Sequence, residues 1–350
     1  MKRNLSQRLL EPLEEPALDR TGFERPRALM DVVGEDLTPL LDLVNRPVVS
    51  ARQFDRSQLV QLCRVAARYE TKRQTVSRPL TGRILVSAFY EPSTRTRLSF
   101  ESAWHRLGGD IMSITDPAST GIAKGESLHD VGEMLNAYGD LVVLRDSNDR
   151  AVYEMMEALR IPIVNAGNGL DEHPTQAMAD IYAILKSCPE LAREHPKCNV
   201  RIGIIGVPAR MRTVRSLLLM LAQLARGIEA VTVISDEKVP FADGQLEELR
   251  RAGLKVGITS DLDAVLPELD VVYINSIAWT GDGYEELGVR YRLDANSPLK
   301  SDAIVMHPLA RGAELDSSLD DTSHNWYFAQ ARGAVFVRMA LLSAILKTFS

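Results

Sequence analysis

Residues 93–97, Ser-Thr-Arg-Thr-Arg, have side chains suited to binding an anion. They follow the apolar stretch 84–89, which predicts a strand, and open a predicted helix from about 96 to 107. Unpaired backbone N–H groups and the dipole at a helix N-terminus favour an anion. Arginine adds a charged fork that suits phosphate oxygens. A capped helix with solvated arginines explains the same residues, so this segment alone leaves both interpretations open.

The next candidate segment, Asp-Glu-His-Pro-Thr-Gln at residues 171–176, contains a histidine and a glutamine. They stand at the start of a predicted helix over 175–187, after a predicted strand over 161–165. His173 and Gln176 are three residues apart and therefore lie on one helical face, where they can donate to and accept from one small ligand. An ordinary helix start with a surface histidine is the alternative interpretation.

Two isolated basic residues extend this pattern. Lys124 lies in the glycine-flanked loop 119–127, which fits either an exposed loop or a mobile lid over an anionic ligand. Arg145 follows the predicted strand 141–144, where a solvated arginine is also unremarkable.

The second half of the chain repeats the arrangement. Residues 212–216, Arg-Thr-Val-Arg-Ser, form a second basic helix start after the predicted strand 200–207, and His307-Pro308-Leu309-Ala310-Arg311 follows the predicted strand 303–306. Gly203 and Gly206 precede the basic segment, but the three-glycine spacing of a dinucleotide site is incomplete. The sequence therefore disfavours a nicotinamide-dependent oxidoreductase.

Alternating strands and helices must position these groups. The remaining expected strands are 111–114, 141–144, 230–234, 256–258 and 271–275, and the remaining expected helices are 57–71, 128–138, 151–159, 213–226, 244–252, 262–266 and 327–348, the last of them amphipathic. Near-continuous apolar strands alternating with helices predict an α/β fold with two doubly wound parallel-sheet domains, covered on both faces. Ligands of such sheets bind at the carboxyl ends of the strands, which predicts an active-site cleft between the two domains.

The expected organisation has a polar N-terminal extension over residues 1–47, loosely structured or docked on the surface. A first domain follows over 48–188 and a second over 189–326, joined at the proline-containing hinge 188–197, and the helix over 327–350 packs back on the first domain.

Composition limits the class of protein. The 350-residue chain carries a net charge of −6, which argues against nucleic-acid binding. Its three scattered cysteines, Cys63, Cys188 and Cys198, fit a reduced, cytoplasmic protein and no metal-ligand spacing. The longest apolar stretch, 334–346, is interrupted by Arg338 and is too short to span a bilayer, so no membrane segment is expected.

Taken together, these segments resemble the aspartate/ornithine carbamoyltransferases. The resemblance extends from about residue 48 to 348 and rests on six segments in the same order: 93–97, 124–126, Arg145, 173–176, 212–214 and 307–309. His307-Pro308-Leu309, with Trp326-Tyr327-Phe328 after it, is similar to the aspartate branch, because the ornithine branch has a cysteine at the position of Pro308.

The resemblance implies a role for each matching residue. Catalytic roles are implied for Arg95, Thr96, Arg145, His173, Gln176 and Lys124, and substrate-binding roles for Ser93, Thr94, Ser119, Thr120, Arg212, Leu309 and Ala310. Residues 93–96 are expected to hold the phosphate of carbamoyl phosphate. The carbonyl oxygen of this ligand is expected to accept from Thr96, Arg145 and His173. Its amide nitrogen is expected to be held by Gln176 and the Leu309 carbonyl. Lys124, with Ser119 or Thr120, is expected to reach a neighbouring subunit's site in a homotrimer, and Arg212 a carboxylate of the acceptor.

The sequence departs from the family pattern where the acceptor is recognised. The aspartate branch carries Arg-x-Gln after the strand equivalent to 271–275, and Ser276 and Ala278 occupy those places here. Serine does not replace a bidentate arginine, and alanine offers no side-chain hydrogen bond. Met211 replaces a glycine, with Arg210 as a possible substitute carboxylate reader, and Ala310 replaces a proline, which leaves a cis bond after Leu309 open.

Carbamoyl transfer to aspartate, in pyrimidine biosynthesis, is the expected function, without metal or cofactor. The alternatives are a carbamoyltransferase with another amino or amide acceptor and a non-catalytic subunit that binds a phosphate ligand or a partner enzyme. The sequence does not decide whether regulatory or dihydroorotase-type partners bind.

Overall fold

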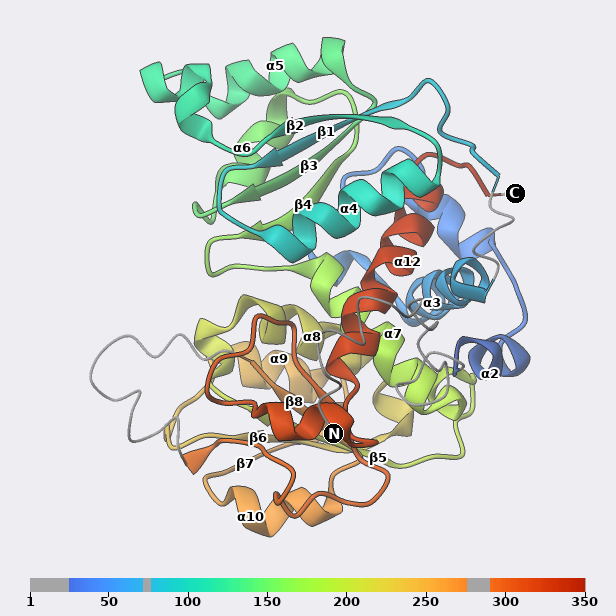
Figure 1. Cartoon of the computed structure of the whole chain (residues 1–350), viewed down its shortest axis with the longest axis vertical. Helices are drawn as coiled ribbons and strands as arrows, with labels where there is room; N and C mark the ends of the chain where they lie inside the picture. The colour runs from blue at the N-terminus through green and yellow to red at the C-terminus, as the bar shows by residue number, and fades with distance from the viewer. Residues whose placement is uncertain (1–24, 72–76, 276–289, 350) are drawn as a thin grey trace, which may run out of the picture.

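Two parallel sheets frame the molecule (Figure 1). The computed structural model describes residues 25–71, 77–275 and 290–349. The first sheet has the order β2-β1-β3-β4, and the second has the order β7-β6-β5-β8-β9. The strands are β1 (Ile84–Phe89), β2 (Asp110–Ile114), β3 (Leu141–Asp146), β4 (Ile163–Asn168), β5 (Val200–Ile205), β6 (Ile228–Ile234), β7 (Val256–Thr259), β8 (Val271–Ile274) and β9 (Ile304–Met306). Every strand pair is parallel, as the alternating pattern predicts.

Helices follow the strands in alternation. They are α2 (Arg25–Val32), α3 (Arg56–Thr71), α4 (Thr94–Arg106), α5 (Leu128–Tyr138), α6 (Ala151–Ala158), α7 (Pro174–Ser187), α8 (Arg212–Gln223), α9 (Gln245–Arg251), α10 (Leu262–Val265) and α12 (Tyr327–Ile345). Figure 1 shows the two sheets at opposite ends of this view, with α3, α7 and α12 between them. The expected α/β class with two parallel sheets is confirmed.

The strands differ in burial. The five residues Leu85–Phe89 of β1, the first five of β3 and all residues of β4 and β9 are buried, whereas β2 and β7 have only exposed and half-buried residues. All of β2, β4, β7 and β9 are edge strands, so edge position alone does not leave a strand uncovered. The expectation that both faces are covered does not hold for β2 and β7.

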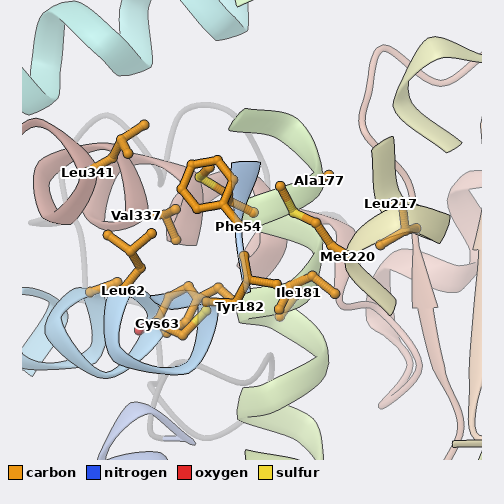
Figure 2. Close-up of a cluster of buried hydrophobic side chains, with 14 of the residues drawn as sticks. Phe54, Leu62, Cys63, Ala177, Ile181, Tyr182, Leu217, Met220, Val337 and Leu341 are labelled. Atoms are coloured by element: carbon orange, nitrogen blue, oxygen red, sulfur yellow. The ribbon is translucent and has the colours of Figure 1, made fainter. Parts of the chain in front are cut away.

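One apolar cluster joins the two halves of the molecule. Figure 2 shows Leu62 of α3, Ile181 of α7, Val337 of α12 and Met220 of α8 in this cluster, and all four are essentially inaccessible to solvent. Helix α7 belongs to the first half of the chain and α8 to the second, so their packing fixes the start of α7 against the start of α8. Both helix starts carry candidate site residues.

The C-terminal helix α12 is buried on nearly every side. By length and composition it could cross a bilayer, but 78% of its apolar window lies inside the protein, against α3, α4 and α7. The sequence predicted an amphipathic helix; the structure shows a core helix instead, because its polar residues, among them Gln330 and Arg338, are buried as well.

Residues 25–43 pack against the helical layer. Leu29 of α2 and Leu40 of the following 3₁₀ helix (Thr38–Leu43) are fully buried, and α2 contacts α3. Half of the expected N-terminal extension thus forms ordered helical structure docked on the body of the protein, and residues 1–24 lie outside the described residues.

Three boundaries near the candidate site differ from the sequence prediction. Helix α4 begins at Thr94 rather than 96, so the basic segment forms its first turn. Strand β3 extends to Asp146, which puts Arg145 on the strand, paired with Phe89, rather than after it. Strand β4 runs over Ile163–Asn168 instead of 161–165, because Asn168 pairs with Asp146 beyond a register shift, although glycine and asparagine have low strand propensity.

Candidate active site

A cavity of about 350 Å³ lies where the carboxyl ends of both sheets meet. It is lined by Glu91, Ser93, Arg95, Thr96, Arg145, Gly169, Leu170, His173, Gln176, Arg210, Met211, Arg212, Thr213, Asn275, Pro308 and Leu309. Eight of the predicted site residues are among them: Ser93, Arg95, Thr96, Arg145, His173, Gln176, Arg212 and Leu309. Four arginines face one carboxylate across this lining, so the cavity suits an anionic ligand.

The first turn of α4 presents its polar groups to the cavity. Ser93 is the N-cap residue, but its side chain makes no capping hydrogen bond, so its hydroxyl and the first N–H groups of the helix are available to a ligand. Burial lowers the pKa of Arg95, whose guanidinium group has no hydrogen bond or ion pair to the described residues. Arg97, in contrast, is paired with Glu101 one turn along the helix.

Glu91 connects the two basic sides of the cavity. Its Oε1 accepts from Arg145 Nη2 at 2.6 Å and from Arg212 Nη2 at 2.8 Å, and its Oε2 accepts from Arg212 Nη1 at 3.0 Å. Burial acts to raise the pKa of Glu91, but Arg212 and Arg145 outweigh it and hold that pKa below its ordinary value. The carboxylate thus stays charged and fixes two guanidinium groups, one from β3 and one from the start of α8.

His173 is buried and neutral. Burial lowers the pKa of its ring well below the usual value, and the nearby charges of Arg145 and Arg212 add to the effect. Its backbone N–H donates to Ser216 Oγ at 3.0 Å, and that hydroxyl donates to Glu172 Oε2 at 3.1 Å. Glu172 also accepts from the Ala51 N–H at 2.7 Å. This chain of bonds holds the start of α7 in place, and a neutral imidazole there serves as a hydrogen-bond donor rather than a cation.

Gly167 keeps space open behind these groups. Its φ is +110°, and a Cβ at this position would stand 3.0 Å from Arg145 Nη1 and 3.3 Å from His173 Cδ2. The absence of a side chain therefore allows Arg145 and His173 to approach each other across β4.

The turn after β9 is held by His307. Its Nδ1 accepts from the Leu309 N–H at 2.8 Å, and its Nε2 is 2.9 Å from Glu314 Oε1. Leu309 has a φ of +58°, and the Leu309–Ala310 peptide bond is cis, so the replacement of proline by Ala310 has not removed a cis bond here.

Five predicted site residues lie outside this cavity. Ser119, Thr120 and Lys124 belong to two short 3₁₀ turns between β2 and α5, Thr94 lines a neighbouring cavity on α4, and Ala310 is absent from the lining. Arg210 lines the cavity but is ion-paired with Glu237 at 2.6 Å. Ser276 and Ala278 lie outside the described residues.

The sequence interpretation missed Glu91, Thr213 and Asn275 as site residues. Glu91 is the second residue after the end of β1, and Asn275 directly follows β8, where Asn275 Nδ2 donates to Thr213 Oγ1 at 3.0 Å. Their position after a strand was the available signal. Among the described residues, no group of three histidine, cysteine or acidic side chains is arranged to hold a metal ion.

Comparison with known proteins gives a consistent result. Residues 46–186 match the model of the aspartate/ornithine carbamoyltransferase carbamoyl-P binding domain, and residues 198–345 match that of the Asp/Orn binding domain. The aspartate carbamoyltransferase catalytic subunit of Methanopyrus kandleri is 37% identical over 311 residues, covering 86% of this chain and 97% of that protein. That of Thermococcus onnurineus is 38% identical over 309 residues, with the same coverage.

Solved structures show the same similarity. Aspartate transcarbamoylase from Trypanosoma cruzi in complex with aspartate and phosphate superposes with a TM-score of 0.80 and 32% identity, covering 89% of this chain and 98% of that one. The same enzyme in complex with N-(phosphonacetyl)-L-aspartic acid also has a TM-score of 0.80, at 31% identity, covering 89% of this chain and all of that one.

Proposed function

The chain belongs to the aspartate/ornithine carbamoyltransferase family, and on that premise we propose that it transfers the carbamoyl group of carbamoyl phosphate to the amino group of L-aspartate. The products are N-carbamoyl-aspartate and phosphate, as in pyrimidine biosynthesis. The observation that carries the proposal is the meeting of the α4 N-terminus, Arg145, His173, Gln176 and Arg212 in one cavity.

The donor is held by groups of the first sheet. Ser93, Arg95, Thr96 and the first N–H groups of α4, with Thr94 completing this turn, bind the phosphate, which is a good leaving group once cations neutralise it. Arg145, neutral His173 and Thr96 donate to the carbonyl oxygen, where negative charge develops as the amine attacks. The departing phosphate takes the amine's proton, so no side-chain base is assigned. Positioning and electrostatic stabilisation therefore supply the catalysis.

The acceptor binds on the side of the second sheet. Arg212 is the group assigned to a carboxylate of the amino acid, and Glu91 holds its guanidinium toward the cavity. Arg210 stands at the same side but is mostly exposed and engaged by Glu237. The residues over 48–188 thus act as the carbamoyl-phosphate domain, with the helix over 327–350 packed against it, and those over 189–326 act as the acceptor domain.

We assign Lys124, with Ser119 and Thr120, to a neighbouring subunit's cavity in a homotrimer. All three lie away from the cavity of their own chain, on a half-exposed loop next to the edge strand β2. A lysine on such a loop can add a cation to the phosphate site of a second copy. The three cysteines are free thiols, which agrees with a reducing, cytoplasmic location.

Phosphate release from carbamoyl phosphate, measured with the purified protein and a panel of amines, tests the function. We expect release with L-aspartate, inhibition by N-(phosphonacetyl)-L-aspartic acid, and loss of turnover in an Arg95→Ala variant. The phosphonate links the two substrate halves, so its inhibition reports on aspartate recognition as well as on the donor site.

The other outcomes each reject part of the proposal. Release with a different amine, and none with aspartate, would mean that Ser276 and Ala278 have changed the acceptor. Binding of carbamoyl phosphate without turnover on any amine would identify a non-catalytic subunit.

A further inference from the structure

A buried carboxylate outside the cavity connects the groups that face the carbamoyl end of the donor. Asp180 lies on α7, one turn after Gln176, and is fully inaccessible to solvent. Its Oδ1 accepts from Gln176 Nε2 at 2.8 Å and from Gln330 Nε2 at 2.6 Å, and its Oδ2 accepts from Tyr273 OH at 3.1 Å. These partners come from α7, α12 and β8, so the carboxylate ties three elements together.

The first of these bonds sets the direction of the Gln176 amide. Asp180 Oδ1 accepts hydrogen bonds both when the carboxyl group is ionised and when it carries a proton on Oδ2, so the amide nitrogen of Gln176 faces Asp180. Its oxygen, Oε1, has no partner among the described residues and is the end left for a ligand in the cavity that Gln176 lines. Without Asp180 the amide is free to flip and present N–H groups instead.

The second bond reaches the turn after β9. Gln330 donates to Asp180, and its Oε1 accepts from the His307 N–H at 2.9 Å. His307 in turn accepts from the Leu309 N–H, and Leu309 lines the cavity. Asp180 therefore helps to hold the backbone of Leu309 in place, through Gln330 and His307.

We propose that Asp180 is a positioning residue that aims two hydrogen-bond acceptors, Gln176 Oε1 and the Leu309 carbonyl, at the amino group of the bound carbamoyl group. The inference rests on the proposed function and adds to it the origin of donor specificity. A ligand that donates two N–H bonds gains from both acceptors, whereas an isosteric methyl group leaves them unpaired. Asp180 thereby makes the site select a carbamoyl over an acetyl phosphate.

The affinities for carbamoyl phosphate and acetyl phosphate, measured by calorimetry without any acceptor amine, test this role. Wild type is expected to bind carbamoyl phosphate about tenfold or more tightly than acetyl phosphate. In Asp180→Leu the preference should fall to nearly equal binding, while the affinity for inorganic phosphate stays within about threefold of wild type. Asp180→Asn keeps an acceptor oxygen for both glutamines and should restore the preference.

Two further variants separate positioning from general damage. Gln330→Met removes the bonds from Gln330 to His307 and Asp180 but leaves the bond between Gln176 and Asp180. It should therefore lower the preference partly, which keeps the proposal testable if Asp180→Leu does not fold. Ser343→Ala removes a buried hydrogen bond of α12 to Tyr69, away from this network, and should leave the preference unchanged.

The results distinguish the two levels of inference. A wild-type preference that persists in both Asp180→Leu and Gln330→Met overturns the role of Asp180, as does an equal loss of inorganic phosphate binding in Asp180→Leu. A wild-type protein that binds neither phosphate donor contradicts the proposed function itself.

Discussion

At the scale of single residues, the candidate site combines residues that the sequence already singles out with Glu91, which only the structure identifies. The arginines and hydroxyls proposed to bind the ligand stand out in the sequence, whereas Glu91 acquires its role from its two partners, Arg145 and Arg212. In Glu91→Gln an amide N–H would face guanidinium donors, and Arg145 and Arg212 would lose their shared anchor. We expect kcat/KM for carbamoyl transfer to fall by about ten- to a hundredfold, corresponding to about 1.5–3 kcal/mol for hydrogen bonds to a charged group.

Glu237→Gln is the matched control for this substitution. Glu237 pairs with Arg210, which also lines the cavity but is mostly exposed, and an exposed ion pair contributes little. Equal losses of kcat/KM in the two variants would show that the bridge between Arg145 and Arg212 has no special role.

Asp180 also predicts a pH dependence of stability. Burial raises the pKa of Asp180 to about 7, against the opposing hydrogen bonds of Gln176, Gln330 and Tyr273 and the charge of Arg338. Because the folded pKa exceeds the unfolded value of 3.8, the stabilisation is complete below about pH 4 and is lost as the pH rises through 7.

Urea denaturation at pH 5 and pH 8 measures this effect. The free energy of unfolding of wild type, relative to Asp180→Asn, should fall by roughly 3 kcal/mol between the two pH values. A constant difference between the two proteins would mean that Asp180 has an ordinary pKa in the folded chain.

At the scale of elements, the end of β4 decides how closely the site residues approach. Ala at a φ of +110° is strained, and in Gly167→Ala the new Cβ also meets Arg145 and His173. We expect a loss of stability of about 1–2 kcal/mol together with a clear loss of carbamoyl phosphate affinity. Thermal or urea unfolding and calorimetry measure the two effects separately.

Gly82→Ala provides the comparison. Gly82 has a φ of +83° and nothing within 4 Å of its missing Cβ, so the variant carries similar backbone strain without the steric contact. It should lose stability and keep its affinity; a parallel loss of affinity would mean that strain alone explains the Gly167 variant.

At the scale of the whole molecule, the proposed trimer places Lys124 of one chain at the cavity of another. Lys124→Ala and His173→Ala should each be nearly inactive alone. After denaturation and joint refolding in equal amounts, about a quarter of the sites combine an intact His173 with an intact Lys124 from the neighbour. Recovery of about that fraction of wild-type activity is the expected result; a mixture no more active than its components would place Lys124 outside the shared site.

The sequence by itself determined most of the periodic elements and the residue types from which the ligand-binding groups were predicted. Strands such as β1 and β3 are mostly apolar, and charged or hydroxyl side chains follow at or after their ends. The strands and these polar segments can therefore be recognised from the local sequence. The parallel α/β class and the prediction of an anion site at the start of α4 followed from such local signals, whereas the roles predicted for Arg145, His173 and Gln176 came from the resemblance to the family.

The tertiary structure alone decided which groups hold those residues in place. Glu91, Asp180 and Gln330 are common polar residues that the sequence did not single out, and their partners are up to 150 residues away along the chain. Burial gives them their function, because a buried carboxylate or amide must find a partner and thereby fixes it. For the same reason α12, whose sequence suggested an amphipathic helix, became the core helix that carries Gln330 to Asp180.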